Sequence, residues 1–470
     1  MTSLALAHVK KAFGGRPVLE DVTFSVAAGE CVGLCGENGA GKTTLLRIIM
    51  GLERPDGGEV RTTASLGMVH QHFSLVPALT VAENVWLGRE PMRRLSFDRD
   101  AAAAQTVALA KRLGMTIDPQ AVVEDLSVGQ KQRVELLKAL RTETELLLLD
   151  EPTAVLGPQD TDAFLELLQT LKSRGIAIVL VTHKLKEIAR VCSRAVVLHK
   201  GRIVADQAPT LAALPALADA MVGGGGNGEK ALAPRVPRAS APSAEVRVQL
   251  AGVGTGELSD ASLTVRRGEI MGVAGVEGNG QEALFRVIVG LDAPARGTLS
   301  LDGKPAPASP AKLRALGVRA IASDRHIDAV LPHMSAGENA RLGHVTSDAA
   351  IREAMERFDV RPLDPDLAIE SFSGGNQQKI MFARELGGAA SLIVANQPTR
   401  GIDFLARDRI WSALAALADA GASVVVISSD TDELRALSDR MAVMYRGKIG
   451  EALAIGEWTD EKLGAAMAGA

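Results

Sequence analysis

The chain carries one long sequence pattern twice, and this repeat constrains its fold more than any other feature. In the first part of the pattern the copies lie 239 positions apart, so that Gly29-Glu-Cys-Val-Gly33 recurs as Gly268-Glu-Ile-Met-Gly272. Further along the offset is 246, and Pro152-Thr153 recurs as Pro398-Thr399. Two collinear copies of this length indicate that the 470 residues form two related domains.

A segment rich in Gly, Ala, Pro and Ser separates the two copies. It begins with Val222-Gly-Gly-Gly-Gly-Asn-Gly and runs to about Ala244. This composition cannot form a core and is typical of a flexible linker. We therefore expect one domain over 1–221, a linker over 222–244 and a second domain over 245–470.

Short apolar runs alternate with helical patterns in the first copy. The runs Glu145–Leu149 and Ile176–Thr182 are typical of buried parallel strands, and Leu126–Arg141 and Asp160–Arg174 have helical spacing. This alternation predicts an α/β architecture with a mainly parallel core sheet. The Ala-rich stretch 76–124 is more helical, which favours a separate helical subdomain.

Composition and charge argue against several classes of protein. The net charge is −4 and aromatic residues make up 3%, whereas nucleic-acid-binding domains are usually basic and often use aromatic stacking. No apolar run approaches the ~18 residues of a membrane-spanning helix, and 1–10 lacks the features of a signal peptide. The three cysteines, Cys31, Cys35 and Cys192, fit a reducing compartment and, for the first two, core packing. We expect a cytoplasmic protein; any membrane-spanning part must belong to other chains.

Residues Gly36 to Thr43 match the phosphate-binding pattern Gly-x4-Gly-Lys-[Ser/Thr] in full. The pattern follows a predicted strand, Glu30–Leu34, and opens a predicted helix, Lys42–Met50, which is the context that makes it specific. In such a loop backbone N–H groups converge on phosphate oxygens, the Lys reaches the β- and γ-phosphates, and the Thr hydroxyl ligates Mg²⁺. The residues expected to bind the nucleotide here are Gly36, Asn38, Gly39, Ala40, Gly41, Lys42, Thr43 and Thr44.

A predicted strand that ends in two carboxylates, Leu146-Leu-Leu-Leu149-Asp150-Glu151, supplies the partner of this loop. Asp150 is expected to bind Mg²⁺, and Glu151 to polarise the attacking water as a general base. A carboxylate pair alone is often a solvated strand end, but beside a phosphate loop it indicates nucleotide hydrolysis.

Further motifs make both copies resemble the ATP-binding cassette (ABC) ATPases. The segments Leu126-Ser-Val-Gly-Gln130 and Phe372-Ser-Gly-Gly-Asn376 are similar to the signature loop of that family, usually Leu-Ser-Gly-Gly-Gln. Each precedes an Asp-Glu-Pro-Thr-like segment, and Val181-Thr-His183 is similar to the switch region. The resemblance implies two tandem P-loop domains, each with a mainly parallel core sheet, an antiparallel β part and a helical subdomain, and it implies ATP and Mg²⁺ as cofactors.

The same resemblance implies roles for three more residues of the first copy. His183 corresponds to the sensor of the γ-phosphate, and Gln71 to the glutamine that contacts the metal and couples the nucleotide state to the membrane partner. Phe13 corresponds to the aromatic that stacks on adenine, although a core aromatic is an equally good interpretation of that position. The resemblance also aligns Ser323 with Gln71 in the second copy.

The second copy departs from the family pattern on its own loop side. The replacements, first copy to second, are Lys42 to Gln281, Thr43 to Glu282, Asp150 to Asn396, Glu151 to Gln397 and His183 to Ser429. The signatures deviate the other way, because Val128 interrupts the first, whereas the second keeps Ser373, Gly374 and Gly375. Asp403 occupies the second copy's D-loop position, where the first copy has Gly157.

In the resembled family two cassettes face head to tail, and each nucleotide lies between the loop of one and the signature of the other. In that arrangement the altered loop of the second copy and the interrupted signature of the first copy would belong to the same site. We therefore expect one competent composite site, made from the first copy's loop and the second copy's Ser373, Gly374 and Gly375.

A fused double cassette resembles the bacterial ATPase subunits of nucleoside and monosaccharide importers, and Met68-Val-His-Gln-His-Phe73 is most similar to the nucleoside branch. That resemblance implies two transmembrane permease subunits, an extracytoplasmic solute-binding lipoprotein as an indirect partner, and a peripheral position on the cytoplasmic face of the bacterial membrane. A homodimer in isolation and a monosaccharide as the solute stay open. A cytosolic ABC protein acting on nucleic acid or the ribosome is the alternative from another class.

Overall fold

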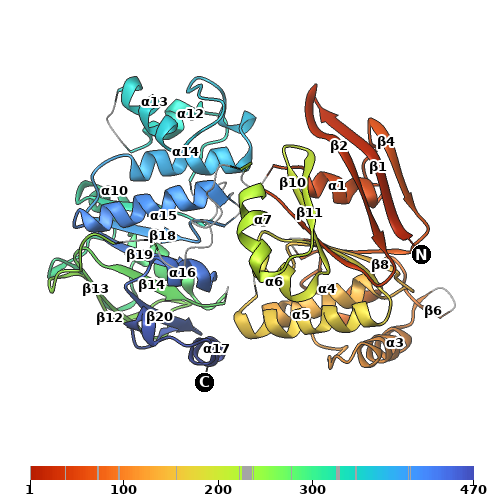
Figure 1. Cartoon of the computed structure of the whole chain (residues 1–470). Coiled ribbons are helices and arrows are strands. Elements are labelled where there is room, and N and C mark those ends of the chain that lie inside the picture. The colour runs from red at the N-terminus through yellow and green to blue at the C-terminus, as the bar shows by residue number, and fades with distance from the viewer. Residues whose placement is uncertain are drawn as a thin grey trace. The chain divides into compact units, whose positions relative to one another are not determined.

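The computed structural model describes residues 2–37, 39–70, 73–93, 96–154, 156–221, 223–224, 236, 238–276, 278–323, 329–343, 347–400, 402 and 404–469. The chain divides into two compact units, Met1–Leu232 and Ala233–Ala470, which we call domain 1 and domain 2 (Figure 1). Each unit is an α/β domain with parallel and antiparallel strands, as the sequence predicts.

Domain 1 is built on a nine-stranded sheet with the order β4-β1-β2-β11-β10-β3-β9-β8-β5. The five strands from β10 to β5 are parallel, and the three central ones, β3, β9 and β8, are buried at every residue. Their continuous runs of Val, Leu and Ile explain this, because parallel strands are covered on both faces. The strands are β1 Thr2–Phe13, β2 Arg16–Ala27, β3 Cys31–Cys35, β4 Gly57–Thr62, β5 Leu66–Val69, β8 Leu146–Asp150, β9 Ala177–Val181, β10 Arg194–His199 and β11 Arg202–Gln207.

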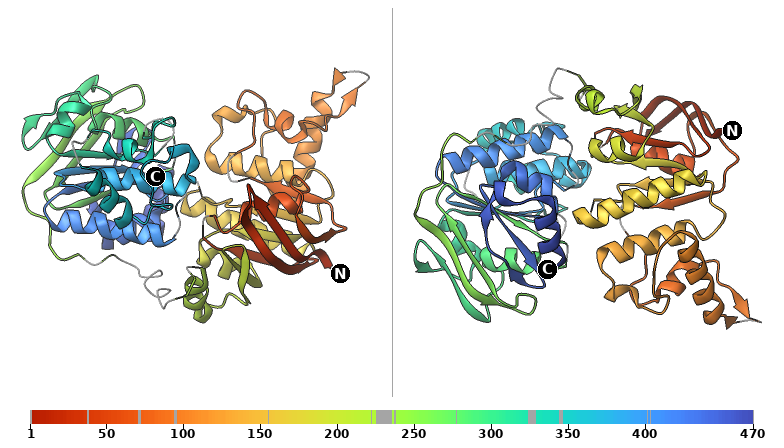
Figure 2. Two further views of the ribbon diagram at one scale, coloured as in Figure 1. Left: turned by 90° about the horizontal axis from the view of Figure 1, so that it is seen from above. Right: turned by 60° about the horizontal axis from the view of Figure 1, so that its bottom comes forward.

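Helix α1 lies in the main hydrophobic core of domain 1. Its apolar face packs between the antiparallel strands β1 and β2 and the parallel strands β3, β8 and β9. Helices α2 and α3 and the short β6–β7 hairpin stand at the margin of the domain (Figure 2). The helices are α1 Lys42–Ile49, α2 Val81–Trp86, α3 Arg99–Arg112, α4 Val128–Ala139, α5 Pro158–Ser173, α6 Leu185–Val191 and α7 Leu214–Met221; the hairpin is β6 Met92–Arg93 with β7 Ser96–Phe97.

Domain 2 repeats this plan with two separate sheets. A parallel sheet has the order β17-β18-β19-β14-β20, with β21 and β22 antiparallel to β20, and a four-stranded antiparallel sheet has the order β13-β12-β15-β16. The strands are β12 Val246–Gly254, β13 Ala261–Arg266, β14 Ile270–Ala274, β15 Arg296–Leu301, β16 Lys304–Pro305, β17 Val318–Ile321, β18 Leu392–Asn396, β19 Ser423–Ser428, β20 Arg440–Tyr445, β21 Lys448–Ile449 and β22 Leu453–Ala454.

The helices of domain 2 belong to two cores. Helices α9, α15, α16 and α17 contribute to the large core around the sheets, whereas α12, α13 and one face of α14 enclose a smaller core of their own. The helices around this smaller core form the helical subdomain of domain 2 (Figure 1). The helices are α9 Gln281–Ile288, α10 Pro310–Ala315, α12 Ala336–Arg341, α13 Asp348–Arg357, α14 Gly374–Leu386, α15 Phe404–Asp419, α16 Thr431–Leu437 and α17 Asp460–Ala468.

Part of the segment predicted as a flexible linker is held on domain 2. The Arg238 guanidinium, 9% exposed, lies 2.8 Å from Asp419 Oδ1 and 2.7 Å from Asp439 Oδ2, and it donates to the Gly268 carbonyl at 2.8 Å. The Ala239 N–H donates to Asp419 Oδ2 at 2.9 Å. These contacts arise because two aspartates remote in sequence meet one arginine, which composition alone does not reveal.

Among the described residues, no helix is both long enough and apolar enough to cross a membrane. The three cysteines are buried and free, and Cys31 Sγ lies 3.2 Å from Cys192 Sγ. The core packing predicted for Cys31 and Cys35 is therefore confirmed.

Candidate nucleotide-binding site

The phosphate loop of domain 1 runs from β3 to α1, as the sequence predicts. Gly41, just before the helix, has a left-handed backbone with φ of +105°, and a Cβ there would lie 2.6 Å from Leu19 Cδ2. A Cβ on Gly36 would collide with the Leu198 carbonyl. Glycine is thus required at both positions by backbone geometry. Asn38 lies outside the described residues; Gly39 and Thr43 are exposed, Thr44 is partly exposed and Ala40 is buried.

Lys42 reaches back over this loop from the first turn of α1. Its side chain is buried, and Nζ donates to the carbonyls of Gly36 at 2.8 Å and Glu37 at 2.9 Å. Burial lowers the pKa of Lys42, although the carboxylates of Glu151 and Asp150 oppose that shift. The lysine is therefore prepositioned at the loop, where a polyphosphate would add the negative charge that favours its ammonium form.

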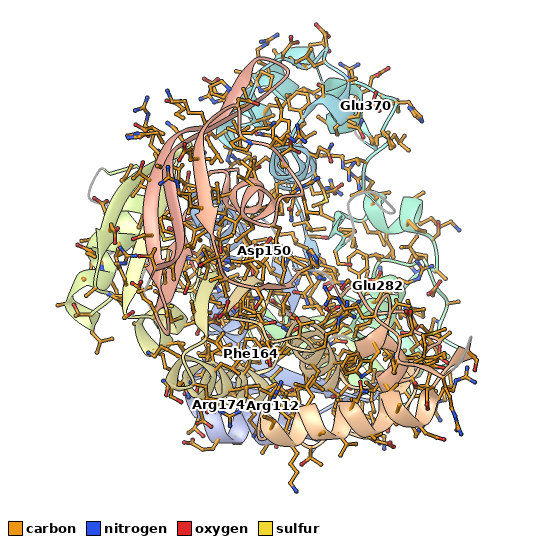
Figure 3. All side chains as sticks on the ribbon, turned by 90° about the vertical axis from the view of Figure 1, so that its right-hand side faces the viewer. Arg112, Asp150, Phe164, Arg174, Glu282 and Glu370 are labelled. Atoms are coloured by element: carbon orange, nitrogen blue, oxygen red, sulfur yellow. The ribbon has the colours of Figure 1, made fainter. Side chains whose placement is uncertain are left out.

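Thr43 and Asp150 bring two oxygen ligands together at the end of β8, where Asp150 is labelled in Figure 3. The Thr43 hydroxyl donates to Asp150 Oδ2 at 3.2 Å. Burial, and then the charge of Glu151, raise the pKa of Asp150 more than Thr43 and Lys42 lower it. A hydroxyl and a carboxylate are oxygen donors that suit Mg²⁺, and a bound cation would favour the ionised form of the carboxylate.

Glu151 and His183 form the second polar pair, at the ends of β8 and β9. His183 Nδ1 lies 3.2 Å from Glu151 Oε1. Burial opposes ionisation of Glu151, but the hydrogen bond to His183 and the charges of His183 and Lys42 outweigh it, so the pKa of Glu151 is lowered. The carboxylate is therefore held in its ionised form, as a proton acceptor requires.

Phe13 ends β1 and is 47% exposed, with Lys11 Nζ 5.1 Å from its ring centroid. Phe13 is therefore not a core aromatic, and its exposed ring is available for stacking. Gln71 and Asp403 lie outside the described residues.

The two signature helices begin differently. In domain 1, Ser127 and Gln130 form a capping box: the Gln130 N–H donates to Ser127 Oγ at 3.3 Å and the Ser127 N–H to Gln130 Oε1 at 2.8 Å. In domain 2, among the described residues, no side chain caps the N-terminus of α14, and Ser373 Oγ instead accepts from Asn376 Nδ2 at 3.0 Å. A Cβ on Gly375 would meet open space. The uncapped, 13-residue α14 leaves its first N–H groups available to an anion.

Sequence reasoning missed one buried acid that supports the site in each domain. The Thr153 hydroxyl donates to Glu187 at 2.9 and 2.7 Å, and the Thr399 hydroxyl donates to Glu433 at 2.7 Å. Glu187 lies in α6 and Glu433 in α16. Glu187 thus connects the helix after His183 to the segment after Glu151, and Glu433 connects the helix after Ser429 to the segment after Gln397. The signal was available, because Glu187 and Glu433 obey the 246-residue offset.

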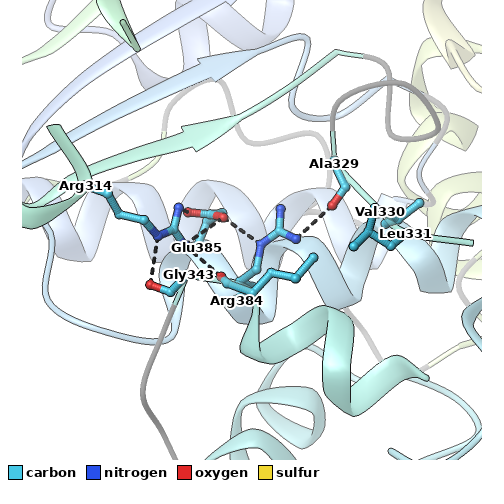
Figure 4. A pocket seen from close by; sticks show the side chains of 8 residues that line it. Arg314, Ala329, Val330, Leu331, Gly343, Arg384 and Glu385 are labelled. Atoms are coloured by element: carbon cyan, nitrogen blue, oxygen red, sulfur yellow. Dashed lines mark hydrogen bonds and ion pairs between the residues drawn. The ribbon is translucent and has the colours of Figure 1, made fainter. Parts of the chain in front are cut away.

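Domain 2 also contains a cavity of about 320 Å³ beside α14 (Figure 4). Glu385, almost fully buried, joins Arg314 and Arg384 beneath it, with Arg384 Nε 2.7 Å from Glu385 Oε1 and Arg314 Nη1 3.2 Å from Oε2. The two arginines donate to the carbonyls of Gly343 and Ala329. Arg314 and Arg384 thus connect Glu385 to the rim, whose side chains include Leu331, which is 48% exposed.

The sequence of the chain matches a known family and known proteins. Residues 19–154 and 258–400 match the ABC transporter family. The whole chain is 35% identical to the nucleoside import ATP-binding protein NupA of Lactococcus lactis, 98% of which is covered. Over 99% of its length it is 36% identical to the ribose import ATP-binding protein RbsA 1 of Rubrobacter xylanophilus, 98% of which is covered.

Among solved structures, the complex of the archaeal ribosomal stalk protein aP1 with the archaeal ribosome recycling factor aABCE1 matches 98% of this chain and 92% of that chain. The TM-score is 0.67 and the identity 17%, so this likeness concerns the fold alone. The family match covers more than half of the chain, and both relatives are covered almost completely. The chain therefore belongs to the ABC transporter family.

Proposed function

We propose that this chain is the ATP-hydrolysing subunit of an importer, with a nucleoside as the solute and a monosaccharide as the alternative. One observation carries the proposal: domain 1 assembles Lys42, the Thr43–Asp150 pair and the Glu151–His183 pair around one phosphate loop. The relatives named above supply the solute classes, since one imports nucleosides and the other ribose.

In the proposed reaction, ATP binds with its phosphates on the loop Gly36–Thr44 and its adenine on Phe13. Lys42 neutralises charge on the β- and γ-phosphates. Thr43 and Asp150, joined by Gln71, would hold Mg²⁺, which when bound offsets the developing negative charge. Glu151 accepts the proton of the attacking water, and His183 holds the Glu151 carboxylate in place while contacting the γ-phosphate.

The composite site is part of the same proposal. Ser373, Gly374 and Gly375 of domain 2 would complete the site of domain 1, and the Gly157 and Asp403 positions follow the same division. The uncapped start of α14 supports this assignment, because its N–H groups are available to a γ-phosphate, whereas Ser127 and Gln130 occupy each other in domain 1.

The proposed partners are two transmembrane permease subunits, with an extracytoplasmic solute-binding lipoprotein acting through them. The chain would then lie on the cytoplasmic face of the membrane as a peripheral subunit. The rim of the cavity beside α14 is a proposed contact for a permease, because its exposed Leu331 follows the Ser323 region that aligns with Gln71.

The experiment that tests this function uses the chain purified together with its permeases in lipid vesicles. ATP hydrolysis is measured with the solute-binding protein loaded with a nucleoside, loaded with ribose, or empty. We expect several-fold stimulation by the nucleoside-loaded form. Stimulation by ribose alone would select the monosaccharide alternative, and hydrolysis independent of any permease or binding protein would contradict the importer.

A further inference from the structure

The phosphate loops of the two domains end in glycines of the same backbone conformation but hold different side chains. Gly41 has φ of +105° and ψ of +7°, and Gly280 has φ of +102° and ψ of +8°. Both glycines precede helices of eight residues, α1 and α9. The duplication therefore kept the turn from the loop into the helix, and the two loops differ in the side chains that follow it.

Gln281 takes the place of Lys42 and closes the loop of domain 2 on itself. Its Nε2 donates to the Val276 carbonyl at 2.7 Å, which corresponds to the bond from Lys42 to Glu37. Its Oε1 accepts from the backbone N–H of Asn279 at 3.0 Å. The side chain is 6% exposed. A neutral amide with both polar atoms used thus bridges the loop and brings no positive charge to it.

Glu282 reverses the direction of the hydrogen bond that joins Thr43 to Asp150 in domain 1. In domain 1 a hydroxyl on the helix donates to a carboxylate on the strand, from Thr43 to Asp150. In domain 2 an amide on the strand donates to a carboxylate on the helix, from Asn396 Nδ2 to Glu282 Oε2 at 2.7 Å, and Ser323 Oγ donates to the same oxygen at 3.1 Å. The Glu282 carboxylate is thereby fixed beside the loop, with its Oε2 already used by Asn396 and Ser323.

Strand β12 of domain 2, which corresponds to β1, ends earlier than the position equivalent to Phe13. Gly58 packs against the His8 carbonyl and Gly297 against the Gly252 carbonyl, which makes Val9 and Val253 equivalent. From there, Leu19 lies ten positions on, but its counterpart Leu258, which faces Gly280 as Leu19 faces Gly41, lies only five positions on. The intervening residues, Gly254-Thr-Gly-Glu257, include no aromatic side chain.

From these three differences we infer that the loop of domain 2 excludes Mg²⁺-bound nucleoside triphosphates, and that the residues responsible are Gln281, Glu282 and Asn396. The chain then binds one Mg²⁺–nucleotide, at the loop of domain 1. The inference rests on the proposed function, in which domain 1 binds ATP, and it concerns binding at domain 2 rather than hydrolysis. Glu282 (labelled in Figure 3) is the decisive group, because it replaces the Thr43 hydroxyl with a carboxylate whose Oε2 already accepts hydrogen bonds from Asn396 and Ser323.

The test is the stoichiometry of the non-hydrolysable analogue AMP-PNP with Mg²⁺, measured by equilibrium dialysis on the full chain. We expect one nucleotide per wild-type chain and fewer than a tenth as many for Lys42→Ala at the same concentration. The variant Gln281→Lys/Glu282→Thr/Asn396→Asp restores the pattern of domain 1 and should bind a second, Mg²⁺-dependent nucleotide. Glu353→Thr, which removes an exposed charge from α13, is the matched control and should keep one.

Each outcome decides the inference. Two nucleotides on the wild-type chain, or one left on Lys42→Ala, would overturn it while the proposed function stands. A restored variant that stays at one nucleotide would overturn the assignment to these three residues. No nucleotide on the wild-type chain would contradict the proposed function itself.

Discussion

At the scale of single residues, Glu151 and Gln397 have the same unusual backbone. Their φ values are +46° and +50°, a region that non-glycine residues seldom occupy. Each backbone N–H donates to the neighbouring strand, Glu151 to the Val181 carbonyl at 2.9 Å and Gln397 to the Ile427 carbonyl at 2.7 Å. The duplication therefore preserved a strained position while its side chain changed from carboxylate to amide.

This equivalence makes Glu151→Gln a clean test of the general base. Domain 2 already places glutamine on that backbone, so the variant should fold, with an unchanged melting temperature. We expect ATP turnover to fall by about 10²- to 10⁴-fold, the usual contribution of a positioned base. Steady-state hydrolysis with the permeases present measures this.

The reciprocal variant Gln397→Glu is the control. It places a carboxylate in a domain that has Gln281 in place of the loop lysine, so hydrolysis should rise by less than about twofold. Turnover near the wild-type rate in Glu151→Gln would refute the role given to Glu151.

At the scale of elements, Glu433 couples α16 to the strand ends of domain 2. It accepts from Ser428 and Thr399 at 2.7 Å each and from Trp411 Nε1 at 3.1 Å. Burial, with a smaller effect from Asp430, raises the pKa of Glu433 from 4.5 to about 7 against these three hydrogen bonds. Between those two pH values the unfolded chain ionises Glu433 and the folded chain keeps its proton.

The sign of the pH effect follows from that difference. Because the folded pKa is raised, this group's stabilising effect is present below pH 4.5 and lost as the pH rises through about 7. Glu433→Gln mimics the protonated form, so its advantage in free energy of unfolding over the wild type should grow across this range to about 1–3 kcal/mol. Calorimetry of the domain 2 transition at several pH values measures it, and an advantage that does not change with pH would contradict it.

Arg238 holds the segment that enters domain 2 by ion pairs with Asp419 and Asp439. Replacing it with Ala leaves Asp419 and Asp439 without their shared cation, so we expect domain 2 to lose about 1–3 kcal/mol. The matched control is Arg435→Ala, which breaks the exposed pair with Asp460 and should change stability by less than about 0.5 kcal/mol. Equal losses in the two variants, measured by calorimetry, would show that Arg238 is an ordinary surface residue.

Regular elements were predictable because their signals are local. The strand predicted at Glu145–Leu149 is Leu146–Asp150, and the helix predicted at Leu126–Arg141 begins after its cap, Ser127. The β6–β7 hairpin and the Arg238 contacts were not predicted. The arginine meets partners 181 and 201 positions away, and pairing at that distance depends on the fold rather than on a local pattern.

At the scale of the whole molecule, the residues of the candidate site could be located in the sequence because the repeat supplies an internal comparison. The loop, the strand-end acids and the signatures could be located, and their differences between copies read directly. The geometry adds what spacing cannot: Ser127 is occupied by its own capping box, and Gln281 bridges its own loop. These contacts support the proposal that the two similar domains have different functions.

The central proposal is that one composite site, made from the loop of domain 1 and the signature of domain 2, hydrolyses ATP. Val128 and Gly374 are equivalent positions, so exchanging them tests the claim within one chain. The measurement is the stimulated ATPase rate of the chain assembled with its permeases. We predict that Gly374→Val lowers the rate by about 10²-fold, because the added side chain would keep the phosphate away from the N–H groups of α14 and so cost as much as the loss of a transition-state donor. Val128→Gly should leave the rate within about twofold. An unchanged rate in Gly374→Val, or an equal loss in both variants, would contradict the account.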